Sequence, residues 1–136
     1  MTVEQIMTRK VVTLRAQQTL REAIGLLQKH RIRHIPVVEG EDVVGIVTDL
    51  DIRRATPSLL SGVDQGQYDK VLNETQVSHV MTRNPFTVTP STALKDAVKI
   101  LMDRKFGALP VVEANRLVGI ITDIDLLRAF HGMLEE

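Results

Sequence analysis

The chain has 136 residues, of which 43% are hydrophobic, enough for one compact domain or two very small ones that share a core, and too many for a disordered chain. It has no cysteine, a formal net charge of zero and four aromatic residues, so we expect no disulfide, no thiolate metal site and no nucleic-acid-binding surface. Residues 1–10 lack the apolar core of a signal peptide and no stretch reaches the ~18 apolar residues of a membrane span, which predicts a soluble, cytoplasmic protein.

The first half of the sequence predicts five elements in the order β-α-β-β-α. Residues 11–14 form a short apolar run typical of a strand. Two runs rich in β-branched residues, 35–38 and 43–48, are separated by the polar link 40–42 and predict a hairpin. A second helix is expected to begin at Asp49. Between the first strand and the hairpin, apolar residues recur with the i, i+3, i+4, i+7 spacing of a helix, at Leu20, Ala23, Ile24 and Leu27.

The linker, residues 57–76, separates the two halves. Pro57 ends the preceding helix, because proline cannot continue one. Residues 61–66 favour a loop. Tyr68, Val71 and Leu72 then have helical spacing, which predicts a short helix before the second half.

The second half repeats the first at a shift of 74 residues and without a gap. Residues 3–55 and 77–129 share 20 identities in 53 positions. Since the two halves must share one fold, the β-α-β-β-α order is expected twice. The fold class is therefore α/β (α+β), with two tandem repeats related by a pseudo-two-fold axis and a cleft between them.

The repeated motifs resemble those of the CBS domain, and the pair resembles a Bateman module. They are Met-Thr at 7–8 and 81–82, Pro-Val-Val-Glu at 36–39 and 110–113, and the Gly-Ile-x-Thr-Asp-x-Asp stretches 45–51 and 119–125. We assign residues 1–56 and 77–136 to two CBS domains. The layout is similar to the acetoin-utilisation B type of stand-alone CBS protein.

The resemblance implies a regulatory module that catalyses nothing and requires no cofactor. Such pairs bind an adenine nucleotide (AMP, ADP or ATP), or less often S-adenosylmethionine, NAD or a cyclic dinucleotide, in the cleft. They commonly form homodimers through their helices. The nucleotide, the number of occupied sites and the regulated partner stay open.

The Thr-x-x-Asp motifs, Thr48 with Asp51 and Thr122 with Asp125, are the first candidates for ligand contact. A carboxylate can accept hydrogen bonds from both ribose hydroxyls, and the resemblance implies this role. The same pattern before a helix is also a capping arrangement. The two roles are compatible.

A basic stretch precedes the first proline-containing strand. Arg33 and His34 lie three and two residues before Pro36, where the family contacts phosphate, and an arginine fork suits a phosphate group. Gly107 and Ala108 hold the same places in the second repeat, so we expect the two sites to differ. The alternative is that the cations favour the negative end of a helix.

An adenine ring needs an apolar slot. The resemblance places Met7 and Val12 at this slot in the first repeat, and Met81 and Phe86 in the second. The hairpins add Ile46 and Ile120. The alternative for each residue is an ordinary core position.

The sequence gives little support to an enzyme or a metal site and leaves a third function as the alternative. No nucleophile motif supports an enzyme. His30 and His34 are four residues apart, but a strand that begins near His34 would spoil a metal site on a helix face. A ligand-free dimerisation or protein-interaction module is the alternative function, with its interface formed by the apolar residues of the second helices, Leu50, Ile52, Ile124, Leu126, Leu127 and Phe130.

Overall fold

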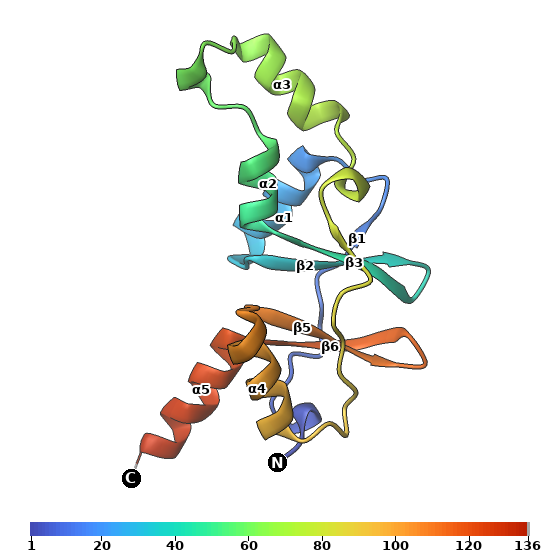
Figure 1. The fold of residues 1–136 in the computed structure, drawn as a ribbon, viewed down its shortest axis with the longest axis vertical. Coiled ribbons are helices and arrows are strands. Elements are labelled where there is room, and N and C mark those ends of the chain that lie inside the picture. Colours follow the sequence, from blue (N-terminus) through green and yellow to red (C-terminus); the bar gives the residue numbers. More distant parts are fainter. Residues whose placement is uncertain (136) are drawn as a thin grey trace. The chain divides into compact units, whose positions relative to one another are not determined.

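Five helices and six strands make up the computed structural model, which describes residues 1–135 and their side chains except that of Leu59 (Figure 1). The mixed α+β class predicted from the sequence is confirmed. The chain divides into two compact units: unit 1 comprises residues 1–11, 41–43 and 85–136, and unit 2 comprises residues 12–40 and 44–84. These units do not coincide with the two sequence repeats.

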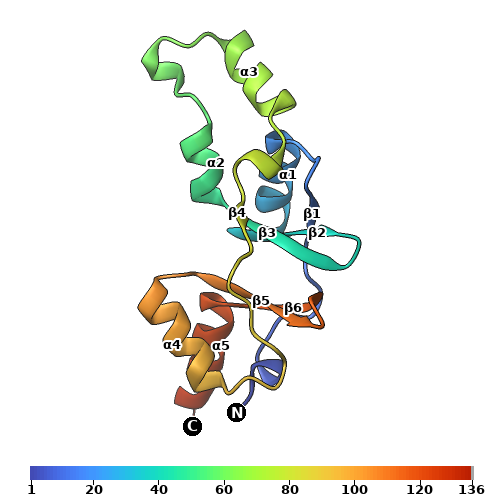
Figure 2. The same cartoon turned by 45° about the vertical axis from the view of Figure 1, so that its right-hand side comes forward.

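Unit 2 is built on the hairpin of β2 (His34–Glu39) and β3 (Asp42–Thr48), whose first residues, 42–43, are counted with unit 1. β1 (Leu14–Arg15) runs parallel to β2, and β4 (Thr82–Arg83) runs antiparallel to β3. The helices are α1 (Leu20–His30), α2 (Asp49–Ala55) and α3 (Gln65–Glu74). Figures 1 and 2 show α1 and α2 on one face of the hairpin.

Unit 1 contains the second hairpin, β5 (Ala108–Glu113) and β6 (Arg116–Thr122), which is antiparallel with a bulge between Val111 and Val112. α4 (Leu94–Arg104) contacts β5 and α5 (Asp123–Leu134) contacts β6. Both helices lie on the same face of the hairpin (Figure 1). This arrangement repeats the hairpin and two helices of unit 2.

Each unit has its own apolar core, formed by the faces that the helical and strand periodicities predict. In unit 2 the core includes Leu20, Ala23 and Leu27 of α1. In unit 1 the matching residues of α4, Ala97 and Leu101, are buried. The interface residues expected from the sequence need one correction here: Ile52 is only 3% exposed and belongs to the core of unit 2.

The helix boundaries follow from local hydrogen bonding. α1 begins with a capping box in which Thr19 accepts from the Glu22 amide and Glu22 accepts from the Thr19 amide. The Gln18 side chain, which donates to the Glu22 carboxylate, lowers the pKa of Glu22. α1 and α4 both end at a left-handed residue, Arg31 and Lys105. In the linker, α3 includes Tyr68 and begins at Gln65, inside the range 61–66 where a loop was expected.

The first strand of each repeat is shorter than the apolar runs suggest. Residues 11–14 were expected to form a strand, but only Leu14 of that run pairs, as part of β1. In the second repeat the matching apolar run is 86–88, and of this run Val88 makes a single parallel bridge to Val111. Each run therefore contributes only its last apolar residue to the sheet.

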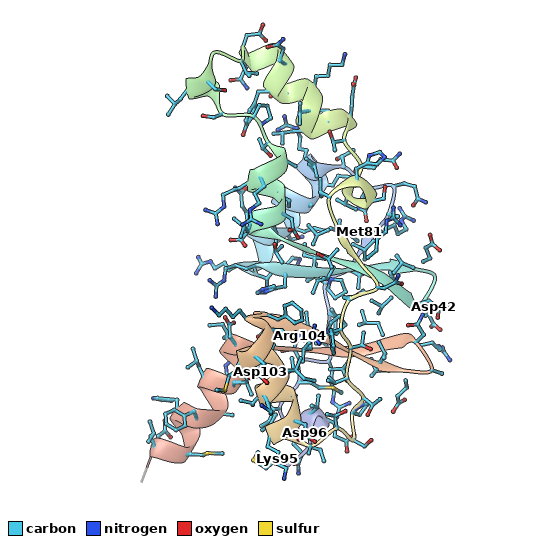
Figure 3. All side chains as sticks on the ribbon, viewed as in Figure 1. Asp42, Met81, Lys95, Asp96, Asp103 and Arg104 are labelled. Atoms are coloured by element: carbon cyan, nitrogen blue, oxygen red, sulfur yellow. The ribbon has the colours of Figure 1, made fainter. Side chains whose placement is uncertain are left out.

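The two sequence repeats exchange their Met-Thr segments. The N-terminal segment, residues 1–11, lies in unit 1, where the Thr8 amide donates to Ile120 O and the Ile120 amide donates to Thr8 O, at 2.8 and 2.9 Å. The middle segment, residues 77–84, lies in unit 2, where the Asn84 amide donates to Val44 O. Each repeat therefore receives the Met-Thr segment of the other repeat. Figure 3 labels Met81 on the middle segment.

Glycine permits both segments to approach their strands closely. A Cβ on Gly119 would lie 2.7 Å from Met7 Sδ and 3.0 Å from Thr8 O. A Cβ on Gly45 would lie 2.5 Å from Met81 Sδ and 3.0 Å from Thr82 O. The glycine of the repeated Gly-Ile-x-Thr-Asp motif is therefore required by packing.

We predict that Gly119→Ala and Gly45→Ala each destabilise the protein by about 1–3 kcal/mol, the usual effect of overpacking against a fixed neighbour. Chemical denaturation measures the change in unfolding free energy. Gly25→Ala is the matched control, because nothing lies within 4 Å of its Cβ position in α1 and alanine there stabilises a helix by about 0.5–1 kcal/mol. An unfolding free energy that stays the same in both strand variants would contradict the packing argument.

Candidate functional site

Both Thr-x-x-Asp motifs form capping boxes. Thr48 Oγ1 accepts a hydrogen bond from the Asp51 amide at 3.1 Å, and Asp51 Oδ2 accepts one from the Thr48 amide at 2.9 Å. Thr122 and Asp125 make the same pair of bonds at 3.3 and 2.9 Å. The capping role predicted for the motif is therefore confirmed in both repeats, and it occupies one oxygen of each carboxylate.

The remaining oxygen of each carboxylate has a different environment. Asp125 Oδ1 accepts a hydrogen bond from the Thr8 hydroxyl at 2.8 Å, and the Asp125 residue is only 6% exposed. Asp51 is half-buried, and among residues 1–135 its hydrogen-bond partner is Thr48 alone. Asp51 Oδ1 thus keeps its capacity to accept hydrogen bonds from a ligand.

Arg33 lies beside the Thr48–Asp51 box. Its carbonyl oxygen accepts a hydrogen bond from the Asp49 amide at 3.1 Å, which ties the residue before β2 to the first residue of α2. Arg33 is exposed and His34, the first residue of β2, is half-buried. In unit 1 the same backbone bond joins Asp123 to Gly107 at 3.0 Å, where Ala108 follows and is buried. Unit 2 therefore has a basic residue at a position where unit 1 has a glycine. In unit 1 a different cation is near the box, since Arg128 Nη1 lies 3.6 Å from Asp125 Oδ1.

The two units divide the apolar residues predicted for the adenine slot differently from the two sequence repeats. Met81 lies in unit 2 with Val12 and Ile46, and Ile46 pairs with the neighbouring Thr82. Met7 lies in unit 1 with Phe86 and Ile120. The exchange of the Met-Thr segments thus separates Met7 from Val12 and Met81 from Phe86. Val12 and Ile46 are half-buried, whereas Met7, Met81 and Ile120 are at most 9% exposed.

Two further residues near Phe86 were not predicted from the sequence. The Phe106 ring lies 6.1 Å from the Phe86 ring, and the Arg104 guanidinium lies 4.3 Å above the Phe86 ring, within the range of a cation–π interaction. Figure 3 shows Arg104 at one end of α4 and Lys95 at the other. Both rings are about two-fifths exposed. The sequence feature that could have indicated this cluster is the pair Phe86 and Phe106, which lie before α4 and just after it.

An open groove of about 690 Å³ lies elsewhere in unit 2. None of the residues predicted from the sequence for nucleotide binding lines it. Its walls come from α1, α2, α3 and the chain after α2, and they include Ile24, Leu27, Ile52, Pro57 and Tyr68.

The residues weighed for metal binding lie on different elements. α1 ends at His30 and β2 begins at His34, as the sequence indicated. Within residues 1–135, no three His, Cys, Asp or Glu side chains gather as a metal would require. No helix in this range is both long and apolar enough to cross a membrane.

A comparison with protein-family models matches the CBS domain twice, over residues 3–58 and 77–132. The chain belongs to the CBS-domain family. The resemblance predicted from the repeated motifs is confirmed. The CBS domain-containing protein YhcV of Bacillus subtilis is 35% identical to this chain over 124 residues, covering 91% of the chain and 81% of YhcV.

Solved CBS pairs share the fold along nearly the whole chain. A Vibrio cholerae structure described as an acetoin utilization protein (AcuB) is 32% identical, with a TM-score of 0.82 over 98% of this chain and 93% of that one. The AMP complex of CBSX2, a CBS-pair protein of Arabidopsis thaliana, is 30% identical, with a TM-score of 0.80 over 98% of both chains. The CBS pair of MJ0100, in complex with 5′-methylthioadenosine and S-adenosylmethionine, is 28% identical, with a TM-score of 0.80 over 98% of both chains.

Enzyme relatives contain the CBS pair as a small part of a longer chain. The inosine-5′-monophosphate dehydrogenase of Korarchaeum cryptofilum is 32% identical to this chain over 124 residues, which cover 90% of the chain but only 23% of the enzyme.

We predict that Asp125→Ala destabilises the protein more than Asp51→Ala does. Loss of the Asp51 capping bond should cost about 1 kcal/mol, the usual contribution of a helix cap. Loss of Asp125 also leaves the Thr8 hydroxyl without its partner and should cost about 2–3 kcal/mol. Urea denaturation of the two variants measures the difference. Equal unfolding free energies would show that the Thr8–Asp125 hydrogen bond contributes nothing.

Proposed function

We propose that this CBS pair is a non-catalytic regulatory module that binds an adenine nucleotide of the AMP, ADP or ATP class at the Thr48–Asp51 box of unit 2. The observation that carries the proposal is the half-buried Asp51, whose Oδ1 accepts no hydrogen bond from residues 1–135 while its Oδ2 is held by the cap. A carboxylate fixed in this way is preorganised to accept hydrogen bonds from ribose hydroxyls.

The neighbouring residues supply the other parts of a nucleotide site. Arg33, which is joined through its carbonyl to α2, can pair its planar guanidinium with a phosphate group, and His34 can add a donor. The half-buried Val12 and Ile46 can border the adenine ring. The absence of cysteine fits a site in the reducing cytoplasm.

The solved relatives support the ligand class. The CBSX2 structure contains AMP, and the MJ0100 structure contains two adenosine derivatives, one of them S-adenosylmethionine. The Arg33 cation favours a ligand with a phosphate over the sulfonium of S-adenosylmethionine, because two positive charges at one end of the site repel each other. NAD and cyclic dinucleotides also carry phosphate, and they are the alternatives to the AMP, ADP or ATP class.

Regulation requires the nucleotide to bind one conformation of the protein more tightly than another. A ligand that contacts both Asp51 and Arg33 would strengthen the link between α2 and β2 in unit 2. Leu50 on α2 is 43% exposed, so a change in α2 would reach an apolar surface residue. We propose that a partner protein or a second copy of the chain reads this change.

We predict that AMP, ADP or ATP raises the melting temperature and that Asp51→Ala and Arg33→Ala abolish the shift. A nucleotide present at about 100 times its Kd stabilises the folded state by about 2.7 kcal/mol, or roughly 10 °C for a chain of this size. The measurement is a thermal-shift assay in which each variant is compared with and without nucleotide, because Asp51→Ala also removes a cap.

Lys29→Ala is the matched control, since it removes an exposed cation from the end of α1 and should leave the nucleotide shift unchanged. S-adenosylmethionine, NAD and cyclic dinucleotides complete the panel. If no compound shifts the melting temperature, the proposal is wrong and the alternative function takes its place. If a shift survives in Asp51→Ala, the assignment of the site is wrong.

The second candidate is a dimerisation or protein-interaction module, favoured by the exposed apolar face of α5. Ile124, Leu127 and Phe130 are 48%, 61% and 56% exposed, although a soluble monomer rarely exposes a contiguous apolar patch of this kind. Leu126, by contrast, packs partly against the core of unit 1. We propose that a second copy of the chain covers this face of α5, with or without nucleotide.

We predict that the double substitution Leu127→Glu, Phe130→Glu converts a dimer into a monomer, because two charges buried in an apolar interface are strongly unfavourable. Sedimentation equilibrium measures the mass. Arg128→Glu is the control, since Arg128 is exposed beside this face and its replacement leaves the apolar side chains in place. A wild-type chain that sediments as a monomer at all concentrations would contradict the dimer.

A further inference from the structure

The two Thr-x-x-Asp boxes have the same sequence motif but different hydrogen bonding. The two carboxylate oxygens of an aspartate together offer about four lone pairs. Asp125 uses three of them, for the Thr8 hydroxyl, the Thr122 amide and the Thr122 hydroxyl, at 2.8, 2.9 and 3.1 Å. Asp51 accepts one hydrogen bond, from the Thr48 amide, among the residues that the structure describes. The box of unit 1 is therefore nearly saturated and the box of unit 2 is not.

Burial around the boxes differs in the same direction. In unit 1 the residues that would meet a ligand are closed off: Ala108 is 5% exposed, Ile120 is 6% exposed and Met7 is 9% exposed. In unit 2 the residues at the matching places of the first two, His34 and Ile46, are half-buried. Met81, at the matching place of Met7, is also 9% exposed, so the units differ in burial at the other two places, where the side chains of unit 2 are the more exposed.

The two Met-Thr segments also continue differently along the chain. Thr82, the first residue of β4, pairs with Ile46 of β3, and Arg83 pairs with Gly45. Asn84 follows with a left-handed φ of 48° and donates to Val44 O, a conformation that asparagine adopts readily. Thr82 is exposed and, within residues 1–135, has no hydrogen bond to Asp51. The N-terminal segment has Lys10 at the place of Asn84, and its contact with β6 is the isolated bridge from Thr8 to Ile120.

We propose that the Thr8 hydroxyl closes the box of unit 1, so that Asp125 anchors the N-terminal segment and only the box of unit 2 takes a nucleotide. This inference rests on the proposed function for the identity of its ligand. The role of Asp125 as an anchor is independent of the proposed function. Each chain then binds one nucleotide, although it contains two copies of the motif. Thr8 is the residue that makes the two sites unequal.

The binding test is isothermal titration with AMP. The wild-type chain and Thr82→Ala, the matched control at the same place in unit 2, should bind one equivalent. Thr8→Ala removes the hydroxyl bonded to Asp125 Oδ1 and leaves only the exposed Arg128, whose Nη1 lies 3.6 Å from that oxygen, so it should bind a second, weaker equivalent. Thr8→Ser keeps a hydroxyl and should bind one. Two equivalents in the wild-type chain, or one in Thr8→Ala, would overturn the proposal.

The second test needs no nucleotide. Hydrogen exchange of the Ile120 amide, which donates to Thr8 O, should be about tenfold faster in Thr8→Ala and in Asp125→Asn, because one charge-assisted hydrogen bond holding the segment is lost. Thr82→Ala should leave this rate within about twofold of the wild-type value. An unchanged rate in Thr8→Ala overturns the anchor. If AMP fails to bind to any variant, the proposed function fails for AMP, and the exchange result alone decides whether Thr8 closes the box.

Discussion

The close contact between each Met-Thr segment and a glycine in the neighbouring hairpin is the constraint on which the rest of the structure depends. At Gly119 there is no room for a methyl group between the strand and Met7. The same contact places the Thr8 backbone on Ile120 and the Thr8 hydroxyl on Asp125. One small residue in the strand thus permits the approach of the segment that completes the core, and the same segment contacts the box that begins at the last residue of the strand, Thr122.

The exchange of segments affects how the two units can fold. Unit 2 consists of residues 12–40 and 44–84, which follow one another along the chain, whereas unit 1 joins residues 1–11 to residues 85–136. Unit 2 also joins distant residues, since the Val77 amide donates to Gln18 O and the Leu20 amide donates to Thr75 O. Contacts between distant residues slow folding. Neither unit can therefore be completed before a long part of the chain is available.

Local patterns in the sequence predicted the elements, and tertiary contacts account for most of what the sequence analysis missed. The spacing of Leu20, Ala23 and Leu27 and the repeated Thr-x-x-Asp boxes act within a few residues, so the helix of the first repeat and both caps were predicted correctly. The grouping of Met7 with Val12 differed from the structure because the two Met-Thr motifs are identical, and identity gives no information about which hairpin each segment joins. Ile52 was expected at a surface because the pattern of a seven-residue helix is too short to define its buried face.

The same reasoning explains why a duplicated motif need not be a duplicated site. Thr8 and Thr82 are the same residue at matching positions, and the sequence alone predicts the same role for both. Their surroundings differ, since the middle segment pairs further along β3 through Arg83 and Asn84, whereas the Thr8 hydroxyl donates to Asp125. The path of the chain beyond the motif thus accompanies the difference between an aspartate that bonds through both oxygens and one that bonds through a single oxygen. In a tandem repeat, the residues that follow a motif can thus differentiate two sites whose motif residues are unchanged.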